Sequence, residues 1–309
     1  MKILHAPADL PASGRKVCLA IGVFDGVHLG HQQVIRQMVA DAQQHEALSL
    51  VVTFDRHPNA IVAPARVPPL IYSPPQKLRA IESMGAEATW LIRFDEEFSR
   101  RTGEEFVRGL GRDFGQLHSV CVGSEFAFGH RRSGNVELLR RLGHEMKFTV
   151  HGLASVALDG RTVSSTRIRE AIARGELDDA SQMLGRNYTI AGRVVKGDQF
   201  GRQLGFPTAN LDVAGLVLPP HGVYAAHAHT GGRALRAAVN IGVRPTLAGA
   251  TPATRVEAHL LDFGEDLYGA ELELAIATKL REEMKFASFA ALKEQIGRDV
   301  IEATRVFEP

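Results

Sequence analysis

The chain has 309 residues, more than one average domain requires, so its length favours two domains. A hydrophobic fraction of 45% beside 23% charged residues is typical of a globular protein with well-formed cores. The formal net charge of +1 gives no reason to expect nucleic acid or an anionic membrane as a partner. The first residues lack an apolar signal core, and the longest apolar runs are too short for a membrane span, so we expect a soluble cytoplasmic protein.

The first half of the chain alternates between strand-like and helix-like segments. Apolar runs predict buried strands at 17–24, 48–54, 88–94, 118–123 and 147–153. Helical spacing and capping signals, such as Thr102 with Glu105, predict helices between them. This order predicts a Rossmann-like α/β domain, a parallel sheet with helices on both faces that binds ligands at the carboxyl ends of its strands. Cys18 and Cys121 fall within the strands and are expected to be buried thiols.

The pattern changes after residue 186. Short strand-like stretches separated by Gly and Pro lie at 188–195, 222–230, 235–242, 255–263 and 271–280, and a helical pattern follows at 286–307. We therefore predict an antiparallel β-barrel with a closing α-helix, a sandwich being the other arrangement that such strands allow. The predicted domains are 1–185 and 186–309.

The stretch GVFDGVHLGH, residues 22–31, directly follows the first predicted strand. His28 and His31 are three residues apart, so they share one helical face and can address one ligand. Gly30 lets that ligand approach the backbone, and a helix N-terminus favours an anion. Two surface histidines are the alternative for this segment alone, and zinc is disfavoured because no nearby residues complete four ligands.

Three further segments lie after predicted strands or before a predicted helix: TFDRHP at 53–58, GSEFAFGHRRSG at 123–134 and VSSTRIRE at 163–170. Hydroxyl and guanidinium groups at the start of a helix can hold phosphate. An ordinary capping box that ends at Glu170 is the alternative for the last segment. The predicted sheet geometry would bring all three segments to the edge that carries the histidines.

This set of motifs resembles the nucleotidyltransferase superfamily, and in full the adenylyltransferase module of prokaryotic bifunctional riboflavin kinase/FAD synthetases. The resemblance implies that the phosphate of FMN attacks the α-phosphorus of ATP and that pyrophosphate leaves. It implies that His28 and His31 are catalytic and that ATP phosphates are bound by Gly22, Phe24, Asp25, Gly30, Ser164, Ser165, Thr166 and Arg169. It implies flavin or nucleotide contacts for Phe54, His57, Pro58, Glu125 and Phe128.

Two positions depart from the pattern of that module. Arg56 replaces the first proline of T-F-x-P-H-P, and Glu125 stands where Asp or Asn is more common. They leave open the alternative that only a kinase activity remains, with a weakened adenylyltransferase site. An absence of FAD when FMN is supplied directly would favour that alternative.

A second constellation is the stretch GRVVKGDQFGRQLGFPTANL, residues 192–211. It fails the test for a Walker phosphate loop because Asp198 and Gln199 stand where Lys and Ser/Thr are required. Thr208 and Asn210 nevertheless offer neutral oxygen ligands suited to Mg²⁺ that carries ATP. A turn between barrel strands is the alternative.

The phrase PTAN after a glycine loop resembles the riboflavin kinase module, and HGVYAA, VNIGVRPT, VEAHLLDF, DLYG and REEMKF follow in order. The resemblance implies ATP binding by Gly197, Gly201, Gly205, Pro207, Thr208 and Asn210, with Mg²⁺ on Thr208 and Asn210. It implies flavin binding by Asn240, Arg244, Arg281 and Phe286.

Glu257 is the candidate catalytic base of this module, since a carboxylate can accept the proton of the riboflavin hydroxyl. It alternates with Val256 and Ala258 on a predicted strand and so points away from them. An ordinary solvent-facing glutamate is the alternative, and His259 on the same face is expected to support the site.

The two modules together predict ATP- and Mg²⁺-dependent phosphorylation of riboflavin to FMN, followed by adenylylation of FMN to FAD. The predicted partners are riboflavin, FMN, FAD and ATP, and the oligomeric state stays open. A non-catalytic flavin-binding regulator on the same scaffold is the alternative from another functional class. Flavin binding without ATP turnover would support that alternative.

Overall fold

The computed structural model describes residues 1–10, 14–243 and 254–308. These residues form two compact units, Met1–Arg167 and Ile168–Pro309. The predicted domain boundary near 185 stays a prediction. Each unit has a sheet of its own.

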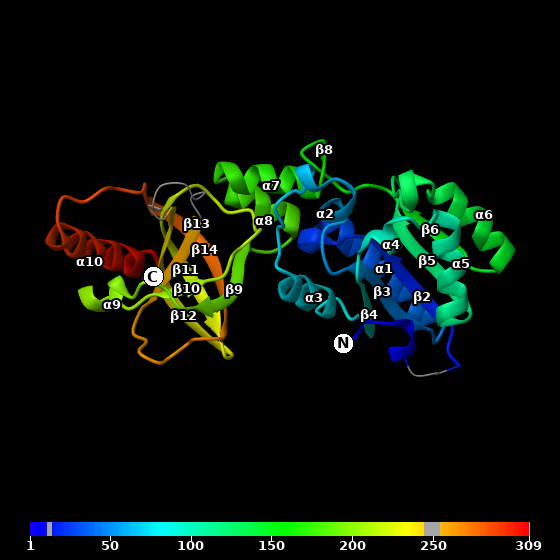
Figure 1. Ribbon diagram of the computed structural model, residues 1–309, viewed down its shortest axis with the longest axis horizontal. Helices are drawn as coiled ribbons and strands as arrows, with labels where there is room; N and C mark the ends of the chain where they lie inside the picture. Colours follow the sequence, from blue (N-terminus) through cyan, green and yellow to red (C-terminus); the bar gives the residue numbers. More distant parts are fainter. Residues whose placement is uncertain (11–13, 244–253, 309) are drawn as a thin grey trace. The chain divides into compact units, whose positions relative to one another are not determined.

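The first unit is built on a six-stranded sheet in the order β1-β4-β3-β2-β5-β6, with every pair parallel (Figure 1). Its strands are β1 (Lys2–Leu4), β2 (Val17–Ile21), β3 (Leu48–Phe54), β4 (Ala88–Ile92), β5 (Leu117–Gly123) and β6 (Thr149–Leu153). The predicted parallel sheet is confirmed. Strand β1 was not predicted, because three residues are too few for a periodic pattern.

One face of this sheet is covered by α5 (Gly103–Phe114) and α6 (Val136–Met146). Leu19, Leu50 and Val120 point to this face from three neighbouring strands and are fully buried in the core beneath the two helices. Successive side chains along a strand point to opposite faces, so the adjacent residues of each strand must pack elsewhere.

The other face is covered by α1 (Leu29–Gln44) and α3 (Pro74–Glu82). Cys18, Val51 and Cys121 point to this face and are fully buried. Both cysteines are free thiols, as predicted, and burial raises the pKa of the Cys121 thiol well above its usual range. The thiols therefore act as packing groups.

The strand order reverses between β2 and β5, because from β2 the chain continues to β3 and β4 on one side and then returns to add β5 and β6 on the other. The carboxyl ends of strands at such a reversal leave a crevice in which parallel sheets bind ligands. Helix α1 begins here, directly after β2. Shorter elements of this unit are α2 (Asn59–Val62), α4 (Glu96–Ser99), β7 (Ala157–Leu158) and β8 (Arg161–Thr162). Helix α7 (Ser165–Arg174) spans the boundary between the two units, and α8 (Leu177–Leu184) lies in the second.

The second unit contains a closed antiparallel barrel in the order β10-β13-β12-β11-β14-β9. Its strands are β9 (Thr189–Val195), β10 (Ala209–Leu211), β11 (Gly222–Thr230), β12 (Arg233–Val243), β13 (Thr254–Leu260) and β14 (Glu271–Arg281). Helix α9 (Phe200–Leu204) precedes β10, and the closing helix α10 (Phe289–Val306) buries Ala303 against Ala225 and Ala238. The predicted barrel and closing helix are confirmed.

Candidate active sites

His28 and His31 lie together at the start of α1, where β2 ends. Their rings stack with centroids 3.6 Å apart, and His28 is buried, with only 7% of its surface exposed. A Cβ at Gly30 would lie 3.3 Å from the His28 ring, so glycine leaves room for the imidazole against the helix backbone. The two imidazoles therefore lie side by side at the carboxyl end of β2, as their spacing in the sequence predicted.

The loop between β2 and α1 has an unusual backbone. Phe24, Gly26 and Val27 all have positive φ, at 54°, 76° and 41°. This conformation is rare for a β-branched residue such as Val27, and strained backbone of this kind clusters at functional sites. A Cβ at Gly22 would crowd the Phe24 ring at 3.0 Å, and this ring in turn packs edge-on against His31.

Asp25 anchors this loop from within. Its buried carboxylate accepts hydrogen bonds from the backbone N–H groups of Ile71, at 3.0 Å, and Tyr72, at 3.3 Å. The Asp25 carbonyl accepts a hydrogen bond from the Ser165 hydroxyl at 3.1 Å. This last bond joins the histidine loop to residues 140 positions later, at the N-terminus of α7. The predicted meeting of the two motifs therefore takes place in the structure.

The remaining residues of VSSTRIRE lie at the same helix start. Ser164 accepts a hydrogen bond from the Arg167 N–H at 3.2 Å, the local pattern of a helix cap. Thr166 is exposed. Arg169 lies four residues beyond Ser165 on α7, within the second compact unit.

The carboxyl end of β3 carries the TFDRHP motif. The Nδ1 atom of His57 accepts a hydrogen bond from the Asn59 N–H at 3.1 Å, which leaves Nε2 as the donor of a neutral ring. Pro58 begins α2. Arg56, which replaces the first proline of the T-F-x-P-H-P pattern, forms a salt bridge with the adjacent Asp55 at 3.0 Å.

A row of phenylalanine rings runs along this edge of the sheet from β3 to the loop after β5. Successive ring centroids are 5.1 to 6.0 Å apart, and the members are Phe54, Phe98, Phe106, Phe128 and Phe126. The row ends at a cavity of about 380 Å³ whose lining includes Glu125, Phe126 and Arg140. Glu125 itself is exposed. Aromatic faces beside a polar cavity can receive a flat aromatic ring with polar substituents.

The barrel aligns three polar residues on adjacent strands. Glu257 of β13 is the direct register partner of Asn210 on β10 and of Asn240 on β12. Directly opposed residues point to the same face, so the three side chains form one row. Val256 and Ala258 are fully buried on the opposite face, as the predicted alternation requires.

The glycine loop, residues 197–205 between β9 and β10, lies directly against this row. A Cβ at Gly197 would collide with the side-chain amide of Asn210. A Cβ at Gly201 would collide with the Phe206 carbonyl and lie 3.3 Å from the Thr208 hydroxyl. Glycine at these two positions is therefore a consequence of close approach, whereas Gly205 ends α9 with a φ of 92°.

Glu257 lies in a setting suited to proton transfer. Burial raises the pKa of its carboxyl, and the Arg255 guanidinium, 3.8 Å away, offsets part of this rise. Asp198 pairs with Arg255 at 2.8 Å and adds to the rise. His259, two residues on, contacts the Pro207 carbonyl through Nδ1 at 2.8 Å and so holds the loop in place.

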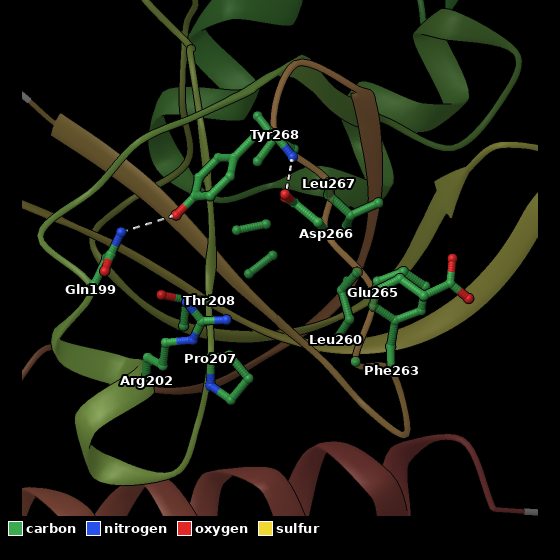
Figure 2. Close-up of a pocket in the computed structure, with 14 residues that line it drawn as sticks. Gln199, Arg202, Pro207, Thr208, Leu260, Phe263, Glu265, Asp266, Leu267 and Tyr268 are labelled. Carbon is green, nitrogen blue, oxygen red and sulfur yellow. Dashed lines mark hydrogen bonds between the residues drawn. The ribbon is translucent and has the colours of Figure 1, made fainter.

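A cavity of about 310 Å³ opens beside the same loop (Figure 2). Thr208 and Pro207 line it together with the 263–268 segment, and Gln199 reaches across to the Tyr268 hydroxyl at 3.4 Å. Asp266 accepts a hydrogen bond from the Tyr268 N–H at 2.9 Å, which shapes the opposite wall. The cavity therefore joins the glycine loop to the DLYG stretch.

The residues predicted to contact flavin in the barrel are less uniformly placed. Asn240 belongs to the polar row. Arg281 forms a two-point salt bridge with the buried Asp299 of α10, at 2.6 and 2.8 Å, and lies 5.9 Å from the Phe286 ring centre. This pairing ties β14 to α10. Arg244 lies outside the described residues.

Comparisons with known proteins agree with this division into two sites. Residues 10–167 match the family described as FAD synthetase, and residues 184–307 match the family described as riboflavin kinase. A bifunctional riboflavin kinase/FMN adenylyltransferase of Escherichia coli (strain K12) is 35% identical over 309 residues, which cover 99% of this chain and 98% of the relative. That of Pseudomonas fluorescens is 36% identical, covering 100% and 99%. The chain belongs to the bifunctional riboflavin kinase/FMN adenylyltransferase family.

Among solved structures, a Streptococcus pneumoniae protein described as a macrolide-efflux protein is similar over 99% of both chains. It is 27% identical, with a TM-score of 0.81. No helix within the described ranges combines the length and apolar character needed to cross a bilayer.

Sequence reasoning did not single out several residues that the structure places beside the two candidate sites. Tyr268 and Asp266 belong to the DLYG stretch, whose pattern carried the resemblance without indicating a role for either side chain. Lys77 carried a weaker signal: it lies four residues before Ile81, so a charged side chain shares the apolar face of α3.

Proposed function

We propose that the two activities of the family are divided between the two sites. The site around His28 would transfer the adenylyl group of ATP to FMN, which yields FAD and pyrophosphate. The site around Glu257 would transfer the γ-phosphoryl group of ATP to riboflavin, which yields FMN. The observation that carries the proposal is the in-register row Asn210–Glu257–Asn240 beside the glycine loop. It sets a carboxylate that can act as a base next to neutral amide oxygens that can bind a metal ion.

In the adenylyltransferase step, a phosphate oxygen of FMN attacks the α-phosphorus of ATP, and the bond from that phosphorus to the β-bridging oxygen breaks. No covalent enzyme intermediate is needed, so catalysis rests on positioning and on stabilising charge. His28 and His31 would donate hydrogen bonds to phosphate oxygens as charge spreads onto them. Ser165 and Thr166, at the N-terminus of α7, would hold the leaving pyrophosphate, with Arg169.

The contacts of Asp25 support a positioning role for this residue, since its carboxylate already holds the backbone at Ile71 and Tyr72. Phe54, Phe128 and the cavity beside Glu125 would receive the flavin ring of FMN, with His57 and Pro58 nearby on the β3 side. The side chain of Glu125 is longer than the Asp or Asn that is more common at this position, and it can still accept a hydrogen bond from the flavin.

In the kinase step, Glu257 would accept the proton of the primary hydroxyl of riboflavin as the hydroxyl oxygen attacks the γ-phosphorus, and ADP leaves. Asn240, Arg281 and Phe286 would border the flavin, with Arg244. The neutral oxygens of Thr208 and Asn210 fit Mg²⁺, which would neutralise charge on the ATP phosphates. The proposal includes a cytoplasmic location, which the family implies.

Purified protein incubated with riboflavin, ATP and Mg²⁺ should produce FMN and then FAD, resolved by chromatography. EDTA in excess over Mg²⁺ should stop FMN formation, and added MgCl₂ should restore it, because the neutral donors cannot replace the cation's charge on ATP. A mixture that yields neither flavin nucleotide would refute the proposal. A parallel reaction that starts from FMN tests the adenylyltransferase site alone.

The close approach of Gly197 to Asn210 makes a sharp prediction for the kinase site. In Gly197→Ala, the new methyl group would push the Asn210 amide aside, so we expect the KM for MgATP to rise by about tenfold or more. FMN-to-FAD conversion should stay within about twofold, which the same preparation can measure.

Gly297→Ala is the matched control. Gly297 lies inside α10, where the added methyl would meet its nearest neighbour, Phe206, at an ordinary 3.9 Å. This substitution should leave both activities unchanged and stabilise the helix by roughly 1 kcal/mol. An unchanged KM for MgATP in Gly197→Ala would remove Asn210 from the ATP site.

A further inference from the structure

Lys77 is a buried lysine in the first unit. It lies on α3, with 8% of its surface exposed, and its ammonium reaches the carboxyl ends of β2 and β3. Burying an ammonium is unfavourable unless hydrogen bonds and nearby charges offset the loss of water. The role of this charge is therefore a question that the two proposed reactions do not answer.

The Lys77 ammonium joins two loop-bearing strand ends. Its Nζ donates hydrogen bonds to the Phe54 carbonyl at 2.7 Å, the Thr53 hydroxyl at 3.3 Å and the Val23 carbonyl at 3.5 Å. The Thr53 hydroxyl in turn donates to the Val23 carbonyl at 3.0 Å. An ammonium has three N–H donors, so these three oxygens use all of them.

These oxygens lie at the start of two loops that carry site residues. Val23 opens the strained loop that ends at His28, and Phe54 leads directly to His57. The two strands are parallel neighbours, but the ladder between them ends at the Ile21–Val52 pair. Beyond it, the Lys77 hydrogen bonds continue the connection between the two strand ends.

Charged groups around Lys77 favour its protonated form. Asp25, from the loop after β2, and Asp55, from the end of β3, face it at longer range, while its direct partners are uncharged oxygens. Burial outweighs both carboxylates and lowers the pKa of Lys77 to about 8. The ammonium therefore persists at neutral pH and is lost as the pH rises through about 8.

We propose that Lys77 is a positioning residue of the adenylyltransferase site, which holds the histidine loop after β2 in register with the β3 end that carries His57. This inference rests on the proposed function of that site. An apolar side chain at position 77 would leave the Phe54 carbonyl without this donor and weaken the connection between the two loops, although the Thr53–Val23 hydrogen bond would remain. A shift of about 1 Å in such groups can lower a rate by about 10²-fold.

The test is Lys77→Met in the full-length protein. We expect the kcat for FMN adenylylation to fall by about 10- to 100-fold, with the KM for ATP changed less than threefold. Riboflavin phosphorylation by the same protein should stay within twofold. Wild-type adenylylation should decline as the pH rises above about 8, where Lys77 loses its charge, and this decline should be absent from the residual activity of the variant.

Arg79→Met is the matched control, since it removes a cation from the same helix. It should keep wild-type rates and the alkaline decline, and an equal loss in this control would overturn the proposal. Wild-type kcat in folded Lys77→Met would also overturn it. Where Lys77→Met does not fold, the test compares Thr53→Val, which removes the hydroxyl that Lys77 binds, with Thr53→Ser, which keeps it. A loss of adenylylation in the valine variant alone supports the role of Lys77, and equal adenylylation in the two variants refutes it.

His28→Ala in the same assay separates this inference from the proposed function. A loss in His28→Ala with full activity in Lys77→Met refutes only the role of Lys77. Full activity in both variants refutes the adenylyltransferase site itself.

Discussion

Glu257→Gln is expected to reduce the formation of FMN from riboflavin by about 10²- to 10⁴-fold, the range that a positioned general base contributes. Glutamine keeps the shape of the side chain but cannot accept the hydroxyl proton. The conversion of supplied FMN to FAD should stay at the wild-type rate, since we assign that reaction to the other site. Chromatographic rates with riboflavin and with FMN, measured on one preparation, check both statements.

Glu302→Gln provides the control for this substitution. Glu302 is an exposed glutamate of α10 that pairs with Arg305 at 3.4 Å, so its loss removes the same charge from the same unit. Both activities should be unchanged in this variant. A Glu257→Gln protein that still phosphorylates riboflavin at the wild-type rate would exclude Glu257 as the base.

His28→Ala should have the converse effect. We expect FAD formation from FMN to fall by about 10²- to 10³-fold, because the proposed hydrogen-bond donor to the transition state is lost and His31 loses its stacking partner. Riboflavin phosphorylation should persist. Initial rates of pyrophosphate release with FMN and of ADP release with riboflavin measure the two activities separately.

The other end of α1 supplies the control. His45 is exposed and packs against His118, with ring centroids 4.0 Å apart, so His45→Ala removes a ring-paired histidine without touching the proposed site. It should leave FAD formation unchanged. Loss of both activities in a folded His28→Ala protein would contradict the assignment of two independent sites.

Some features could be predicted from sequence because they depend on local spacing. The Thr102–Glu105 capping box forms as predicted, since its two hydrogen bonds join residues three apart. The alternation of Glu257 with Val256 and Ala258 follows from the pleat of any strand. The neighbouring positions of His28 and His31 follow from a local helix start, since His28 is the N-cap residue of α1 and His31 its third residue.

Features that depend on pairing over long distances were harder to predict. The three residues of β10 show no period of their own, and the strand is stabilised by pairing with β9 and β13. The Arg281–Asp299 salt bridge ties together two elements whose contact no local pattern indicates. Both features arise from tertiary contacts, which override weak local propensity.

By itself, the sequence determined the two-domain plan, the parallel sheet followed by a barrel, and the motifs that carry each candidate site, because hydrophobic period and motif spacing are local properties. Only the tertiary structure decided how the motifs meet. It joins Ser165 to Asp25 across 140 positions, sets Asn210 and Asn240 beside Glu257, and buries Lys77 between two strand ends. Such contacts depend on strand order and packing, which spacing along the chain does not record.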